Sequence, residues 1–178
     1  MQPAGSIPAK LSVLDNLEQL GGKGVYTLVV LVPAQRTITV GSLGSHRFPA
    51  GYYAYTGSAL GRGAVSLRGR VLRHLREDKK RKWHIDHLLS GANAEMKAVI
   101  AANTEKKLEC EINCYLKDRL RAEIPVPKFG SSDCRKNCGS HLLYLGQDQH
   151  VPERTAQLYS EKLDAKIFFF SIGHLGSA

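Results

Sequence analysis

The sequence contains no long apolar run, and its most apolar late stretch, FFFSI, is only long enough for a strand. A helix that crosses a membrane needs about 20 apolar residues, so we expect no such helix and no membrane partner. The first residues also lack the charged and then apolar segments of a secretory signal. We therefore expect a cytoplasmic protein.

Cysteine is scarce, with 4 residues among 178, which excludes a small disulfide scaffold and favours reduced thiols. Hydrophobic residues make up 43% of the chain and charged residues 23%, which is enough apolar material for a core and excludes a disordered chain. At this length, one domain of ordinary size is expected.

Acidic residues are few, at 16 against 25 basic ones, so the formal charge is +9. The excess is concentrated between residues 62 and 82, where nine basic and two acidic side chains give +7. Such a segment is typical of a protein that binds a polyanion, most often nucleic acid. The alternative is a solvated helix face without a partner.

The spacing of apolar residues changes between strand and helix periods along the chain. It predicts strands at residues 24–32, 36–40, 52–58, 95–101, 140–145 and 166–173. It predicts helices at residues 10–20, 65–75, 83–89, 104–120 and 152–165. The fold class is therefore mixed α/β (α+β), with a small central, mostly antiparallel sheet flanked by helices. We divide the chain into an N-terminal extension (1–22), one domain (23–146) and a C-terminal helix-strand extension (147–178).

Candidate chemistry begins with Tyr26 and Tyr55, which both lie on predicted strands with a glycine two residues away. A cross-strand aromatic pair is the simplest structural explanation for them. Arg70, Arg73 and His74 follow at positions i, i+3 and i+4, so they share one helix face. Such a face can present a guanidinium and an imidazole to one phosphate.

The order of these motifs resembles that of the GIY-YIG nuclease superfamily. GVY stands in place of the first signature and YTG in place of the second, and the arginine-histidine helix and a later glutamate follow. The strings GYYAYTGSALG, RHLR, WHIDHLL, ECEI and FGSSDC…SHLLY most resemble a stand-alone archaeal and bacterial branch catalogued as a domain of unknown function. The resemblance implies a divalent-metal-dependent endonuclease that hydrolyses phosphodiester bonds in DNA, with Mg²⁺ or Mn²⁺ as cofactor.

The resemblance also implies roles for individual residues. Glu109 would hold the metal, Arg70 would steady the scissile phosphate, and Tyr26 would help to activate the attacking water. Tyr55 would support the water or the phosphate, and Arg73 and His74 match a pair found near the site. Glu111 competes with Glu109, and we prefer Glu109 because an apolar residue follows it three positions later, as in the family.

Other residues complete the candidate site. His74 or His84 could take the proton instead of Tyr26, since an imidazole titrates near neutrality. Ser58 and Asp133 are possible accessory residues because they lie within or beside the matched strings. Binding of nucleic acid, DNA rather than RNA, is assigned to Arg62, Arg68, Arg73, Arg76, Lys79, Lys80, Arg81 and Lys82.

The cysteines could form a zinc site if Cys134, Cys138 and His141 were joined by Cys110 or Cys114. The spacing is loose and there is no second CxxC pair, so we expect no zinc there. Cys110 and Cys114, one helical turn apart, are instead expected to be small residues that face the core.

Two other functions stay open. The segment between residues 36 and 51 is an insertion relative to the family, and Thr56 is polar where the family has an aliphatic residue. Both features favour a non-catalytic nucleic-acid-binding module that keeps the nuclease fold. A protein whose basic face docks on an acidic protein surface is the third hypothesis.

Overall fold

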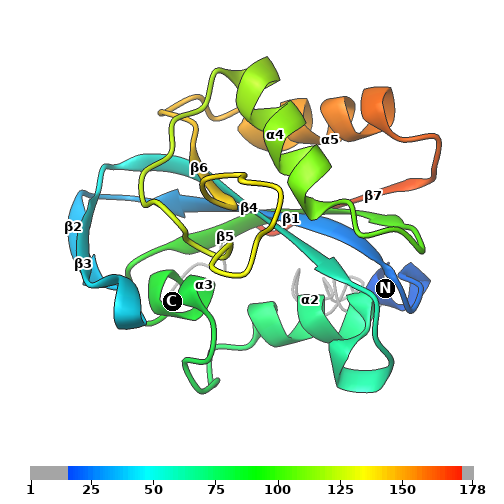
Figure 1. Cartoon of the computed structure of the whole chain (residues 1–178), viewed down its shortest axis with the longest axis horizontal. Helices are drawn as coiled ribbons and strands as arrows, with labels where there is room; N and C mark the ends of the chain where they lie inside the picture. Colours follow the sequence, from blue (N-terminus) through cyan, green and yellow to red (C-terminus); the bar gives the residue numbers. More distant parts are fainter. Residues whose placement is uncertain (1–15, 174–178) are drawn as a thin grey trace, which may run out of the picture.

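A five-stranded antiparallel sheet forms the centre of the molecule, in the strand order β6-β4-β1-β5-β7 (Figure 1). The computed structural model describes residues 16–173. The sheet consists of β1 (Gly24–Val32), β4 (Gly51–Ala59), β5 (Glu95–Asn103), β6 (Leu142–Tyr144) and β7 (Ile167–Ser171). The helices are α2 (Leu67–Leu75), α3 (His84–Leu88), α4 (Glu109–Leu120) and α5 (Val151–Lys162). The predicted fold class is confirmed.

The helices cover both faces of the sheet, with α2 and α3 on one face and α4 and α5 on the other (Figure 1). Side chains alternate along β1, so that Tyr26, Leu28 and Val30 join the core on the α2/α3 face. Val25 and Val29 join the core on the α4/α5 face. Because β1 is buried on both faces, its sequence is an almost continuous β-branched and apolar run.

The segment between β1 and β4 folds into a second, two-stranded sheet of β2 (Arg36–Thr39) and β3 (Ser45–Phe48). A 3₁₀ turn, η2 (Gly41–Leu43), connects the two strands. The sequence predicted β2 but not β3, because β3 is short and carries mostly polar residues. Ile38 and Phe48 nevertheless anchor this hairpin in the core of the α2/α3 face.

One helix prediction is wrong at its start, and another lies mostly outside the described residues. Helix α4 begins at Glu109 rather than after Thr104, whose hydroxyl accepts a hydrogen bond from Lys106 N within a turn. The predicted helix at 10–20 lies mostly outside the described residues, and its described end is a 3₁₀ turn, η1 (Leu17–Gln19). A further 3₁₀ turn, η3 (Gly63–Val65), precedes α2.

The C-terminal segment shares the sheet and its core. Strand β7 pairs with β5 along the edge of the sheet, and α5 packs against the same face as α4. Between residues 16 and 173, no helix is long and apolar enough to cross a membrane.

Candidate active site

Tyr26 and Tyr55 project from β1 and β4 on the α2/α3 face of the sheet. They are not a direct cross-strand pair, because Tyr26 lies opposite Gly57 and Tyr55 lies opposite Leu28. A methyl group at Gly57 would lie 2.6 Å from the Tyr26 hydroxyl oxygen, and one at Gly130 would lie 2.6 Å from the Tyr55 ring. Each ring is therefore seated on a glycine, which explains the glycine of the YTG string.

His74 of α2 lies against both tyrosines. Its Nε2 is 2.9 Å from the Tyr26 hydroxyl, and its ring centre is 6.2 Å from that of Tyr55. Burial lowers the pKa of His74 to about 3 and, against the charge of Arg70, raises the pKa of Tyr26 to about 12. The prediction that His74 titrates near neutrality is therefore wrong: at neutral pH both groups are uncharged.

Arg70 lies within the reach of both tyrosines. Its positive charge acts on the hydroxyls of Tyr26 and Tyr55, which lowers their pKa values against the larger effect of burial. The guanidinium stacks on Trp83, with 5.2 Å between its carbon and the ring centre. Its Nε is buried and has no hydrogen-bond partner among residues 16–173. Arg70 thus keeps a buried donor that no group of residues 16–173 uses.

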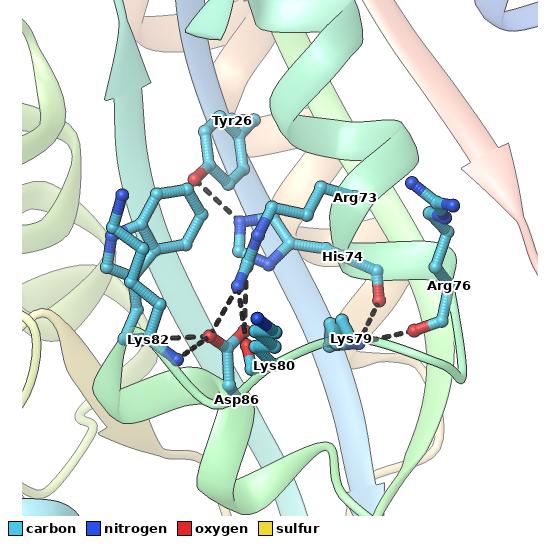
Figure 2. A network of polar contacts seen from close by, with 9 residues as sticks. Tyr26, Arg73, His74, Arg76, Lys79, Lys80, Lys82 and Asp86 are labelled. Atoms are coloured by element: carbon cyan, nitrogen blue, oxygen red, sulfur yellow. Dashed lines mark hydrogen bonds and ion pairs between the residues drawn. The ribbon is translucent and has the colours of Figure 1, made fainter. Parts of the chain in front are cut away.

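Arg73, in contrast, is occupied by Asp86. The guanidinium donates two hydrogen bonds to the buried carboxylate, at 2.8 and 2.7 Å, and a third to Lys80 O at 3.0 Å (Figure 2). The same carboxylate accepts the backbone N–H groups of Lys82 and Trp83, both at 2.8 Å. Arg73 was predicted to bind nucleic acid, but its guanidinium already makes these bonds, which tie α2 to the start of α3.

Glu109 is the first residue of α4 and is 6% exposed. Its backbone N–H donates to the Ser58 hydroxyl at 3.2 Å, and its Oε1 is 3.4 Å from Lys107 Nζ. Its Oε2 is buried without a hydrogen-bond partner in the described part of the chain, and its charge acts on Tyr55. Glu111 points elsewhere, into an exposed ion pair with Lys162 at 2.9 Å. Of the two glutamates, Glu109 is the one whose charge acts on Tyr55.

The basic side chains of residues 62–82 are of two kinds, those that bond to other groups of the fold and those that are exposed. Lys79 donates to the carbonyls of His74 and Arg76 at the end of α2, so it is used inside the fold (Figure 2). The six exposed side chains are Arg62, Arg68, Arg76, Lys80, Arg81 and Lys82. Arg62 and Arg68 also line a pocket of about 460 Å³ beside the start of α2, together with Lys23 and Glu105.

The loop before β6 forms a further wall of the site. Gly130 N donates to His84 Nδ1 at 2.9 Å while its Cα faces the Tyr55 ring, so the accessory residue His84 holds this loop. Asp133 is exposed, and its charge acts on Lys107. Gly130 lies within the matched string FGSSDC, but nothing in that string indicates that this glycine contacts Tyr55.

The cysteines are arranged differently from the prediction. Cys110 is buried, but Cys114 is exposed and does not face the core, because it lies on the outer side of α4. Cys110 lies instead with Cys134, Cys138 and His141, and their sulfur and nitrogen atoms are all within 4.8 Å of one another.

The comparison with family models gives a match over residues 25–163 to the family described as Domain of unknown function DUF123. The chain belongs to this family. The match extends from β1 to the end of α5, so the DUF123 domain includes the tyrosines, α2, Glu109 and the cysteine-histidine cluster. No curated protein and no solved structure matches the chain.

Proposed function

We propose that this DUF123 protein is a divalent-metal-dependent endonuclease of the GIY-YIG type, which hydrolyses phosphodiester bonds in DNA. The observation that carries the proposal is the meeting of opposite charges at Tyr55. Both Arg70 and Glu109 act on its hydroxyl, as do Tyr26 and Asp86. Arg70 and Glu109 each keep one buried polar atom without a partner in residues 16–173, Arg70 Nε and Glu109 Oε2. Because buried polar atoms are normally paired, both are suited to bind a ligand.

Arg70 and Glu109 have complementary roles toward a phosphodiester. The Arg70 guanidinium donates hydrogen bonds to the phosphate and balances its negative charge. The unpartnered carboxylate oxygen of Glu109 fits a hard cation, so Glu109 would hold Mg²⁺ or Mn²⁺. When bound, the cation neutralises charge on the phosphate and lowers the pKa of a bound water. The Ser58 hydroxyl fixes the backbone of Glu109 and thereby its direction.

In this proposal the tyrosines stay protonated and position the reacting groups through hydrogen bonds. With its pKa raised to about 12, Tyr26 stays protonated at neutral pH and acts as a hydrogen-bonding group. The neutral His74 ring holds the Tyr26 hydroxyl in place, since the two lie 2.9 Å apart and are both buried. The exposed basic side chains next to this site would bind the flanking backbone of the DNA.

The test compares two glutamates of one helix turn. Glu109→Gln is expected to slow plasmid cleavage in Mg²⁺ by roughly 10²–10³-fold, because the metal ligand is lost. Glu111→Gln is the matched control and is expected to cleave at the parent's rate, since Glu111 is exposed and paired with Lys162. Equal rates for all three proteins would overturn the assignment of the site.

The second candidate function is a nucleic-acid-binding module that does not cut. The pKa values favour it, since neither Tyr26 near 12 nor His74 near 3 can accept a proton from water at neutral pH without help. This function predicts DNA binding that weakens steeply with salt and no cleavage with any divalent metal. Cleavage that EDTA stops would exclude it.

A further inference from the structure

Three cysteines and one histidine meet beside the first turn of α4, in a cluster distinct from the tyrosine site. Their closest contacts are Cys134 Sγ to Cys138 Sγ at 3.3 Å and Cys110 Sγ to Cys134 Sγ at 3.4 Å. His141 Nε2 lies 3.5 Å from Cys110 Sγ. All four donor atoms lie within 4.8 Å of one another, so they converge on one point.

These separations are close to those of a tetrahedral metal site. With metal–sulfur bonds of about 2.3 Å and metal–nitrogen bonds of about 2.0 Å, two sulfurs lie about 3.8 Å apart and a sulfur and a nitrogen about 3.6 Å apart. The contacts of 3.3–3.5 Å need only small side-chain rotations to reach these values. They are also well beyond the length of about 2.05 Å of a disulfide bond.

The backbone that carries the donors is held by contacts that do not involve them. His141 N donates to Phe129 O at 2.8 Å, and His141 O accepts from Thr56 N at 3.0 Å, which fixes His141 beside β4. Asn113 Nδ2 of α4 donates to Ser140 O at 2.7 Å, which ties the loop to the helix that carries Cys110. The donor set is therefore preorganised by the fold.

The His141 ring has the surroundings of a metal ligand. Its Nε2 faces the sulfur of Cys110, and the ring also forms a hydrogen bond with the backbone of Gly130. Histidines that bind metals commonly use one ring nitrogen for the ion and the other for a carbonyl or carboxylate that orients the ring.

The loop between Phe129 and His141 lacks an apolar interior of its own. Its residues 132, 133 and 135–137 are exposed and polar, whereas Cys138 is 6% exposed. Its backbone includes a non-glycine residue of positive φ, Asn137 at 54°. The buried sulfurs occupy the position that apolar side chains would fill in a larger segment. Small polar segments of this kind are commonly stabilised by a structural metal.

We propose that Cys110, Cys134, Cys138 and His141 bind one structural Zn²⁺ ion. Thiolate and imidazole ligands in a tetrahedral set favour zinc, and four protein ligands leave no open position for a substrate or water. The ion joins the 129–141 loop to the start of α4. Its role is structural and does not depend on nuclease activity.

The position of the ion gives it an effect on the candidate active site, and this step rests on the proposed function. Cys110 directly follows Glu109, and the loop that it holds places Gly130 against Tyr55. Zinc at this point fixes the Glu109 backbone and one wall of the tyrosine site together.

The test measures metal in the full chain, purified without chelators from cells grown with zinc. Elemental analysis is expected to find one zinc per chain in the parent and in Cys114→Ser, the matched control, whose thiol is exposed one helical turn after Cys110. Cys138→Ser is expected to lose most of its zinc. Glu109→Gln should keep its zinc whether or not the protein cuts DNA, which separates this inference from the proposed function.

A second measurement needs no variant and so does not depend on whether Cys138→Ser folds. Co²⁺ exchanged into the parent should give the absorption of a tetrahedral site with thiolate charge-transfer bands. Parent protein without zinc and without these bands after Co²⁺ addition would overturn the proposal. So would mass spectra that show Cys134 and Cys138 joined as a disulfide in the freshly purified protein.

Discussion

Each face of the central sheet carries a buried tyrosine hydroxyl, and the two hydroxyls have different hydrogen-bond partners. On the α4/α5 face, the Tyr159 hydroxyl lies 2.7 Å from Thr27 Oγ1, which lies 2.8 Å from Thr56 Oγ1. The hydroxyls of Tyr159, Thr27 and Thr56 are therefore all paired in one row, which gives the polar side chain of Thr56 a partner inside the sheet. On the α2/α3 face, the Tyr26 hydroxyl meets His74, whose Nδ1 has no partner within residues 16–173.

The difference shows which of the two buried tyrosines lies among polar groups that are left unpaired. A buried polar atom without a partner costs free energy, about 1–3 kcal/mol per group. On α2, His74 Nδ1 and Arg70 Nε lack such a partner in the described chain, and both residues act on Tyr26. On α4, Glu109 Oε2 and Asn113 Oδ1 lack one as well. The Tyr159 hydroxyl thus lies in a row of paired hydroxyls, whereas the Tyr26 hydroxyl lies among groups that keep donors or acceptors for a ligand.

The largest expected effect is on the rate of cleavage. Arg70→Gln should slow DNA cleavage by roughly 10²–10³-fold, because the half-buried guanidinium that we propose to bind the phosphate is lost. Its loss of stacking on Trp83 should cost only about 1 kcal/mol of unfolding free energy. Arg76→Gln, which changes the exposed arginine at the C-terminal end of the same helix, is the control in a plasmid assay. Equal loss in both variants would mean that Arg70 contributes only general surface charge.

The next largest effect is on the free energy of unfolding, from a change at Gly57, which packs against the Tyr26 ring. Gly57→Ala places a methyl group 2.6 Å from the buried Tyr26 hydroxyl, so the ring or the strand must shift. We expect a loss of about 1–3 kcal/mol in urea unfolding, together with reduced cleavage. Gly22→Ala is the control, because nothing lies within 4 Å of its new methyl group. A Gly57→Ala protein as stable and active as the parent would contradict the close packing of Tyr26.

The dependence of stability on pH tests the buried state of His74. Its folded pKa of about 3 lies below the ordinary value of 6.5 because of burial, with Asp86 opposing and Lys79, Arg73 and Arg70 adding to the decrease. Between these two values the unfolded chain binds a proton that the folded chain does not, so stability falls as the pH decreases.

His74→Gln should remove this contribution. Above pH 4, where Asp86 is still ionised, the stability of the parent should fall relative to the variant by up to about 1.4 kcal/mol per pH unit. His84 and His141 are present in both proteins, so their contributions cancel in the difference. Urea unfolding at pH 6.5, 5.5 and 4.5 would measure it. Parallel pH profiles for the two proteins would show that His74 titrates normally.

The smallest expected effect is on the free energy of unfolding, from the loss of the Tyr159 hydroxyl on the α4/α5 face. Tyr159→Phe removes one hydroxyl from the chain to Thr27 and should cost about 1 kcal/mol of unfolding free energy. Chemical unfolding measures this loss, and Tyr115→Phe, whose hydroxyl makes an exposed contact of 3.3 Å with Glu161, is the control. A loss of cleavage without a loss of stability would reverse the assignment of the two faces.

The sequence predicted most of the sheet because its strands carry strong β-branched and apolar runs, as in β1 and β7. It missed β3, whose four residues gain their strand from pairing with β2 rather than from their own pattern. It placed Arg73 on the correct helix face, but helix periodicity does not show that Asp86, 13 residues later, occupies it. Cys110 likewise meets Cys134 only through the packing of α4 beside β6 and its preceding loop.

The most direct test of the account compares Tyr26→Phe with Tyr159→Phe in one plasmid cleavage assay with Mg²⁺. Each variant removes one buried hydroxyl from one face of the same sheet. We predict that Tyr26→Phe cleaves roughly 10²-fold more slowly than the parent, whereas Tyr159→Phe keeps the parent's rate. Cleavage by both variants at the parent's rate would contradict the claim that the α2/α3 face is the active site.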